Sequence, residues 1–189
     1  MISHTHSIRR RQHGFSLIEV MISMVVLTIG LMALLATMGV LMAATQTSQE
    51  DLIARQVASE AMESIFNARD TSQLGFASIA NTPTGIFTPG TLPLLCAGPD
   101  GILGTADDTT CVAANGAICA VQCLSEPGPD GILGTADDVN MQLTDFTRNI
   151  AITQLNATEQ LVTITITYNV PNIGHFRTYT LNEAISMYH

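Results

Sequence analysis

The sequence predicts an α+β fold in which a long N-terminal helix packs on a small antiparallel sheet, with a loop region stapled by disulfides. Three observations predict this fold. A charge-free apolar segment near the N-terminus runs into a pattern of helical period, four cysteines lie close together in the middle of the chain, and apolar and polar residues alternate near its C-terminus. A chain of 189 residues has room for one modest domain beside such an extended helix.

The first 14 residues form a short basic segment with no apolar core of its own. They contain Arg9, Arg10 and Arg11, three of the seven arginines in a chain that has no lysine. A secretory signal has its cleavage site after the apolar stretch, whereas here the apolar residues follow Gly14 and would stay on a protein cut there. We therefore expect residues 1–14 to be a leader peptide whose basic cluster stays in the cytoplasm.

A single long helix is predicted for residues 15–70. The 30 residues Val20–Gln49 carry no charge, and about 20 apolar residues suffice to span a bilayer. From Glu50 to Asp70 there is neither glycine nor proline, and apolar residues recur every four positions. This apolar stripe consists of Ile53, Val57, Ala61 and Ile65. Residues 15–45 are therefore expected to lie in an apolar environment, and the rest of the helix to pack on a sheet through the stripe.

Residues 71–189 are expected to form a globular domain that begins with a long loop region containing one or two short strands. The loop region holds Cys96, Cys111, Cys119 and Cys123. An even, clustered count in an exported chain predicts two disulfides, and three pairings are open. A zinc site is the less favoured alternative, because the spacings do not form paired C-x-x-C knuckles.

The C-terminal part predicts a three-stranded antiparallel meander. Residues from Leu161 to Tyr168 alternate between apolar and polar, which is typical of a strand with one buried face. A strand from Phe146 to Leu155 precedes it, and a strand from His175 to Leu181 returns after a turn. Such a half-buried sheet, laid over the amphipathic helix, makes a complete small core.

An eleven-residue segment, residues 98–108, recurs letter for letter as residues 128–138. Each copy contains three aspartates among several glycines; together they are Asp100, Asp107, Asp108, Asp130, Asp137 and Asp138. Ca²⁺ prefers six to eight oxygen ligands, and glycine lets a chain curl around the ion, so we expect the copies to bind calcium. The segment also resembles Asp/Gly-rich calcium-binding loops of secreted bacterial proteins. The alternative is two polar hairpin turns, because Pro-Asp-Gly is a turn signal by itself.

The seven residues Gly14–Val20 read Gly-Phe-Ser-Leu-Ile-Glu-Val and resemble the signal of type IV prepilins and type II secretion pseudopilins. The resemblance implies that prepilin peptidase cuts after Gly14 and methylates Phe15. It also implies that Glu19, at the position of the family's glutamate, steers the docking of subunits into a filament. The alternative for Glu19 is a helix N-terminal acid at the level of the lipid headgroups. A pilin-like fold, with the helix first and the meander last, is implied as well.

The resemblance further implies a structural minor subunit of a type IV pilus. The run that begins at Leu27 is similar to minor prepilins called pilus modification proteins, and no proline occurs between Phe15 and Asp70. The implied partners are other pilin subunits, prepilin peptidase and the bacterial inner membrane, which the protein leaves for a periplasmic or extracellular filament. The alternatives are a minor pseudopilin of a type II secretion system and a membrane-tethered calcium-binding adhesion module.

The charge distribution argues against nucleic acid as a partner. Without residues 1–14 the chain has 16 acidic residues and four arginines, a formal net charge of −12, whereas phosphate binding requires a basic surface. Asp51 and Arg55 lie one helical turn apart and are expected to form an ion pair. The sequence contains no G-x-S-x-G, phosphate-loop or HExxH motif, so we expect no enzymatic activity.

Overall fold

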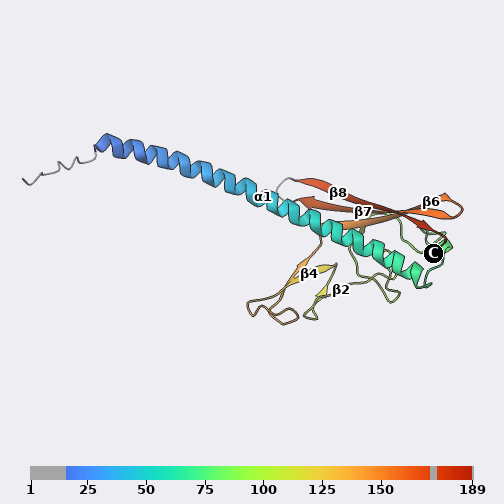
Figure 1. The fold of residues 1–189 in the computed structure, drawn as a ribbon. Helices are drawn as coiled ribbons and strands as arrows, with labels where there is room; N and C mark the ends of the chain where they lie inside the picture. The colour runs from blue at the N-terminus through green and yellow to red at the C-terminus, as the bar shows by residue number, and fades with distance from the viewer. Residues whose placement is uncertain (1–15, 171–173, 189) are drawn as a thin grey trace, which may run out of the picture. The chain divides into compact units, whose positions relative to one another are not determined.

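The computed structural model describes residues 16–170 and 174–188 (Figure 1). The chain divides into two compact units, Met1–Thr45 and Gln46–His189. The predicted α+β fold, with one long helix, an antiparallel sheet and two disulfides, is confirmed.

Helix α1, Leu17–Asp70, is continuous over 54 residues and contributes to both units. In the first unit most of its side chains are apolar and exposed. The most apolar window of 18 residues has a mean hydropathy of 2.4 and contains no buried residue. By length and composition this part of α1 is able to cross a membrane. Exposing so many apolar side chains to water is unfavourable, so lipid or other apolar helices are the environment that suits it.

In the second unit α1 presents the predicted apolar stripe to the core. Its buried residues are Ala54, Val57, Ala58, Ala61, Met62, Ile65 and Ala68. Small alanine side chains alternate with larger ones on this face, which lets other elements approach the helix closely. The helix ends at Asp70, after which Leu74 donates its amide to the Ala68 carbonyl (2.9 Å) and turns the chain back over the core.

The main sheet has four antiparallel strands in the order β1-β6-β7-β8. These strands are β1 Leu92–Pro93, β6 Phe146–Asn156, β7 Glu159–Val170 and β8 His175–Ser186. The predicted meander is β6, β7 and β8, and β8 is five residues longer than expected because its pairing with β7 runs on to the Glu159–Ser186 pair. The alternation in β7 has the expected consequence, since Val162, Ile164, Ile166 and Tyr168 are all buried.

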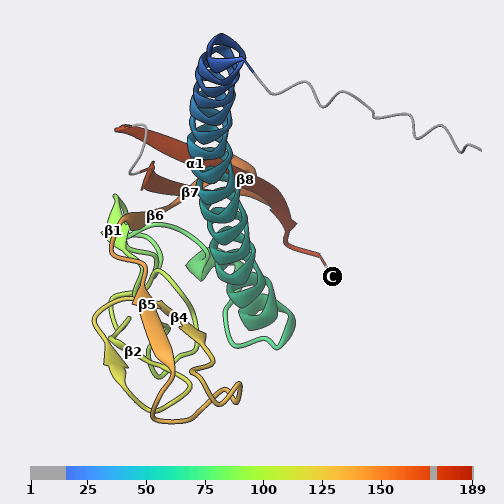
Figure 2. The ribbon, with the colours of Figure 1, turned by 90° about the vertical axis from the view of Figure 1, so that its left-hand side faces the viewer.

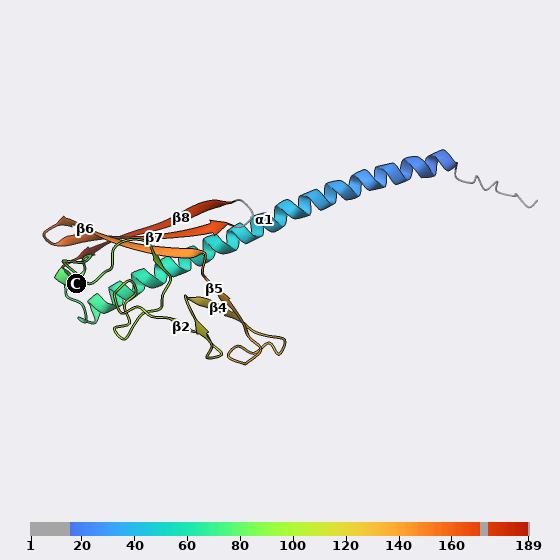
Figure 3. The same cartoon turned by 180° about the vertical axis from the view of Figure 1, so that it is seen from behind.

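The loop region contains more short strands than the one or two expected. Beside β1 it forms β2 Cys111–Val112 with β3 Ile118–Cys119, and β4 Cys123–Glu126 with β5 Val139–Gln142. A 3₁₀ helix, η1, covers Phe76–Ser78. Strands of two to four residues are too short to show an alternating pattern, so the sequence did not reveal them. Figure 2 shows these small ladders as a group apart from the four-stranded sheet, and Figure 3 shows the same group from behind.

The disulfides join Cys96 to Cys111 and Cys119 to Cys123. The sequence left three pairings open, and the packing of the loop region selects this one. Cys111 and Cys119 face each other across β2 and β3, so the two bridges share one small core. The bridges therefore hold together a lobe that has few apolar side chains to stabilise it.

Candidate functional site

The described part of the N-terminal signal begins at Ser16, directly before α1. The Ser16 carbonyl accepts hydrogen bonds from the amides of Glu19 and Val20, at 3.0 and 3.3 Å, which starts the helix. Glu19 is exposed in the first turn, where the helix dipole favours a carboxylate. Gly14 and Phe15, where processing is expected, lie outside the described residues. The structure thus places Glu19 at the exposed start of an apolar helix.

The two copies of the repeat fold into the same loop. In both, the first aspartate accepts the amide of the following isoleucine, at 2.9 Å in the first copy and 2.8 Å in the second. The third aspartate accepts a glycine amide at 2.7 and 2.6 Å, and the threonine hydroxyl donates to the second aspartate at 2.6 Å in both copies. Gly101 and Gly131 share a φ of +70°, a conformation that favours glycine. The eleven residues therefore determine the conformation of the loop themselves.

The backbone pairs that close the two loops are also equivalent. Cys96 forms a β-bridge with Thr109 around the first copy, and Glu126 pairs with Val139 around the second, 30 positions later at both ends. These closing residues differ in type between the copies. The structural repeat therefore extends beyond the identical letters.

The first copy is docked into the core. Ile102 and Leu103 are each only 3% exposed and belong to the main apolar cluster. The Leu103 amide donates to Ser64 Oγ on α1 (3.3 Å), and the Gly104 carbonyl accepts the amide of Thr88 (2.8 Å). We call the surface that receives these residues, which includes Ser64, Thr88 and the main apolar cluster, the seat of the first copy. It provides apolar contacts for Ile102 and Leu103 and hydrogen bonds to the loop backbone from Ser64 and Thr88.

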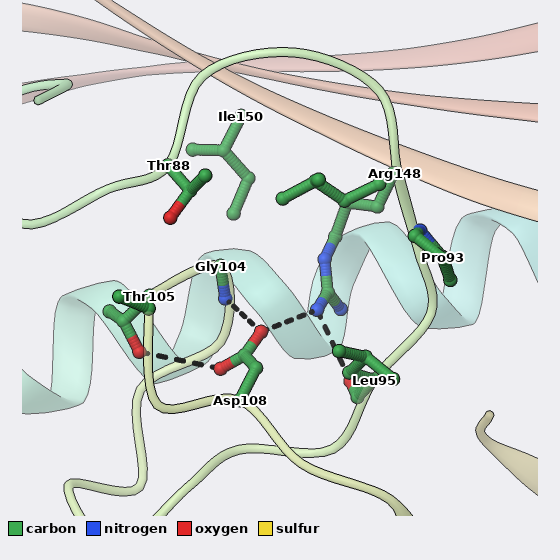
Figure 4. A pocket seen from close by; sticks show the side chains of 10 residues that line it. Thr88, Pro93, Leu95, Gly104, Thr105, Asp108, Arg148 and Ile150 are labelled. Atoms are coloured by element: carbon green, nitrogen blue, oxygen red, sulfur yellow. Dashed lines mark hydrogen bonds and ion pairs between the residues drawn. The ribbon is translucent and has the colours of Figure 1, made fainter. Parts of the chain in front are cut away.

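A buried arginine completes the seat (Figure 4). The Asp108 carboxylate accepts the Gly104 amide and lies 3.5 Å from Arg148 Nη2, which also donates to the Leu95 carbonyl (3.3 Å). Arg148 is 3% exposed, and its Nη1 has no hydrogen-bond partner. Burial raises the pKa of Asp108, and the Gly104 amide and the long ion pair only partly oppose this. The buried ion pair between Arg148 and Asp108 therefore fixes the position of the loop and adds little to the stability of the fold.

Among the residues that the structure describes, no surface receives the second copy in this way. Ile132 is 60% exposed and Leu133 is 54% exposed, although their sequence and backbone match those of the buried pair. The nearby strands β4 and β5 leave Val139 and Met141 exposed as well. Identical residues therefore have opposite environments in the two copies, which sequence reasoning had no means to detect.

The six aspartates that were expected to bind calcium are distributed within their own loops. Protein donors contact the carboxylates in each copy, and the pKa values of Asp107 and Asp137 are lowered, first by the hydroxyl of the threonine two residues earlier. Within residues 16–170 and 174–188, no three acidic, histidine or cysteine side chains come together as metal ligands would. Calcium binding by these loops stays a prediction.

A polar cluster that the sequence did not indicate joins α1 to the sheet. Asp51 accepts a hydrogen bond from the Tyr168 hydroxyl and pairs with Arg177 Nη1 (3.2 Å) instead of the expected Arg55. Burial, followed by the bond to Asp51, raises the pKa of Tyr168 to about 12. The β7–β8 register places Tyr168 opposite Arg177, so a single carboxylate reaches both. Arg55 instead lies over the Tyr179 ring, 5.6 Å from its centroid.

Comparison with known protein families concerns the N-terminal segment. Residues 9–35 match the family model described as the prokaryotic N-terminal methylation motif, which is the signal of type IV prepilins and pseudopilins. The chain carries a prepilin signal. Residues 36–189 lie outside this match, and neither a curated protein nor a solved structure matches the chain.

The residues matched as a prepilin signal lie at the start of α1, where the structure has an exposed apolar helix. The matched segment includes Glu19 and the first part of the exposed apolar helix. A prepilin signal implies processing by prepilin peptidase and assembly with other pilins, and the apolar helix fits membrane anchoring before assembly. Proteins with this signal are structural and in general not enzymes.

Proposed function

We propose that the protein is a non-catalytic structural subunit of a type IV pilus. Prepilin peptidase cuts it after Gly14 and methylates Phe15, and α1 then holds it in the bacterial inner membrane until assembly moves it into a periplasmic or extracellular filament. One observation carries the proposal: a prepilin signal leads directly into a helix whose first part is apolar and exposed. The same helix supplies the core face of a folded domain.

Glu19 is assigned the role of setting the position of the incoming subunit. A carboxylate at the start of an apolar helix is costly in lipid unless it is paired. The positive amine at Phe15 of a neighbouring processed subunit is a suitable partner, because each charge then neutralises the other as an ion pair. Glu19 is exposed on α1, which supports this role.

The finer assignment is a minor subunit of the pilus. Major pilins often carry a proline that bends this part of the helix. Here no proline occurs from Phe15 to Asp70, and α1 runs through this region as one continuous helix, which supports a minor subunit. The alternative within the same class is a minor pseudopilin of a type II secretion system, because both kinds of subunit carry this signal. The genes beside the coding sequence distinguish the two: pilus assembly genes favour the first and secretion genes favour the second.

The exposed second copy of the repeat favours a different candidate, a membrane-tethered calcium-binding adhesion module. Its loop presents apolar and acidic side chains to solvent. In that case α1 would anchor single molecules and make no contact between subunits. The two functions therefore differ in whether the apolar part of α1 meets another copy or another pilin.

Cross-linking through Leu31→Cys tests the proposed function. Leu31 is exposed in the apolar part of α1, so in cells that make the filament an oxidant should produce a ladder of linked subunits. The control is Leu31→Cys combined with Gly14→Ala, which keeps the leader and should abolish the ladder. A monomer in both proteins would contradict the pilus subunit and support the tethered module.

A further inference from the structure

The second copy of the repeat is a preformed acidic and apolar surface. Ile132 and Leu133 lie exposed on a loop whose conformation the loop itself maintains. Asp130 and Asp137 are exposed beside them, and residues 111–142 contain no lysine or arginine. A loop that is already ordered loses little conformational entropy on binding. A surface that suits it has apolar side chains together with a cation.

The same unit has a groove of about 430 Å³ between α1 and the β7–β8 edge. Seven residues line it: Asp51, Arg55, Tyr168, Phe176, Arg177, Thr178 and Tyr179. Phe176 is 76% exposed, and Tyr179 forms an aromatic wall beneath the guanidinium of Arg55. The groove therefore offers apolar rings and arginine in one place.

Arg55 is the cation of this groove that is available to a partner. Of the four arginines beyond the leader, Arg69 pairs with Asp70, Arg148 pairs with Asp108, and Arg177 pairs with Asp51. In the part of the chain that the structure describes, no carboxylate lies within ion-pair distance of Arg55, which is exposed. An unpaired guanidinium in so acidic a chain attracts a carboxylate from outside.

We propose that the loop of residues 128–138 in one copy docks into this groove of a second copy. Ile132 and Leu133 contact Phe176 and Tyr179, and an aspartate of the loop pairs with Arg55. The inference rests on the proposed function and deepens it by naming a contact between subunits.

The first copy shows that the loop is able to dock in this manner. In its seat an isoleucine–leucine pair is buried beside α1 while an arginine of the sheet lies against an aspartate of the loop. The groove likewise joins an α1 face to aromatic rings and a guanidinium; more of its lining is polar than in the seat, and its carboxylate, Asp51, is already paired with Arg177. Because the loop and the groove are different surfaces, the contact is head-to-tail, and a head-to-tail contact extends into a filament when the rotation between copies does not close a ring.

Photo-cross-linking tests the contact in the full-length protein in membranes that contain prepilin peptidase. Benzoylphenylalanine in place of Ile132 should give a linked dimer whose cross-link maps to residues 176–179 of the second copy. The matched control places the same probe at Leu155, an exposed apolar residue near the end of β6, which should give no dimer. Arg55→Glu should lower the dimer yield about threefold, as expected for a partly exposed ion pair.

A second substitution separates a lost contact from a damaged fold. Asp137→Asn added to Arg55→Glu should recover part of the yield, because it removes the repulsion between the two carboxylates while its amide oxygen still accepts the Thr135 hydroxyl. A dimer that forms equally well with Arg55→Glu, or that maps elsewhere, overturns the docking contact.

The Leu31→Cys cross-link distinguishes this inference from the proposed function. A ladder through Leu31 without a dimer through position 132 overturns the docking contact and leaves the pilus subunit in place. If neither cross-link forms, both proposals fall.

Discussion

The hydroxyl of Tyr168 donates a hydrogen bond to Asp51, 117 residues earlier in the chain. This contact fastens the C-terminal end of the inner strand β7 to α1, close to the point where the charge-free segment of the helix ends. Arg177 joins the same carboxylate from the neighbouring strand. One acidic side chain thus ties the helix to two strands.

Tyr168→Phe should destabilise the folded domain and change its response to alkaline pH. Loss of a hydrogen bond to a charged acceptor costs about 1.5–3 kcal/mol. The pKa of Tyr168 is raised from 10.0 to about 12, so its contribution to stability is complete below pH 10.0 and is lost as the pH rises to about 12. The melting temperature of the detergent-solubilised wild type should therefore fall more steeply with rising pH, across this range, than the melting temperature of the variant. Equal pH slopes in the two proteins would contradict this role.

Glu50→Gln should stabilise the protein at neutral pH. Burial, then Asp145 and Asp51, raise the pKa of Glu50 above 4.5, and its Oε2 atom is buried without a hydrogen-bond partner. A carboxyl with a raised pKa binds its proton more tightly in the folded state, so stability increases as the pH falls through this pKa. The variant should lose that dependence. The control is Glu63→Gln on the exposed helix face, and a melting temperature that changes equally in both variants would argue against the effect.

Ile102 and Ile132 occupy the same position in the two copies, so substituting each in turn tests how much burial in the seat contributes to stability. Ile102→Ala should cost about 2–5 kcal/mol, because a buried side chain leaves a cavity. Ile132→Ala should change the free energy of unfolding by no more than about 0.5 kcal/mol, since the side chain is already in solvent. Chemical unfolding measures both. Equal losses would mean that the first copy is not docked as the structure shows.

Calcium is expected to raise the melting temperature of the full-length protein, and EGTA to lower it. An ion that binds the folded state alone stabilises that state by mass action. Asp130→Asn combined with Asp137→Asn in the exposed copy should reduce the shift without disturbing the seat. Magnesium is the control ion, because it dehydrates reluctantly and prefers octahedral sites. No shift with either calcium or EGTA would mean that these loops do not bind the ion.

Glu19→Ala should leave the protein in the membrane and reduce its incorporation into filaments. The apolar part of α1 remains intact, so insertion is unaffected, whereas the ion pair with the neighbouring amine is lost. Glu19→Asp is the control, since it keeps the charge and should retain part of the incorporation. Immunoblots of sheared filaments and of membranes measure both quantities. Unchanged incorporation of the alanine variant would refute the role of Glu19 in docking.

The amino-acid sequence by itself determined the prepilin signal, the long helix and the strand β7. Each is encoded in neighbouring residues: the signal in a contiguous motif, α1 in an apolar period of four, and β7 in strict alternation. Such local patterns keep their meaning wherever the segment is placed. The number of disulfides also followed from a count, without their pairing.

Only the tertiary structure decided the contacts between distant segments. It gave Asp51 the partners Tyr168 and Arg177 in place of Arg55, because strand register brought them to the helix. It also buried Ile102 and left Ile132 in solvent, although the two copies are identical in sequence and in backbone. Burial depends on what surrounds a segment, and the first copy lies against α1 and β6 while the second closes a hairpin of the small lobe. For this reason the same eleven residues are part of the core in the first copy and form an exposed surface in the second.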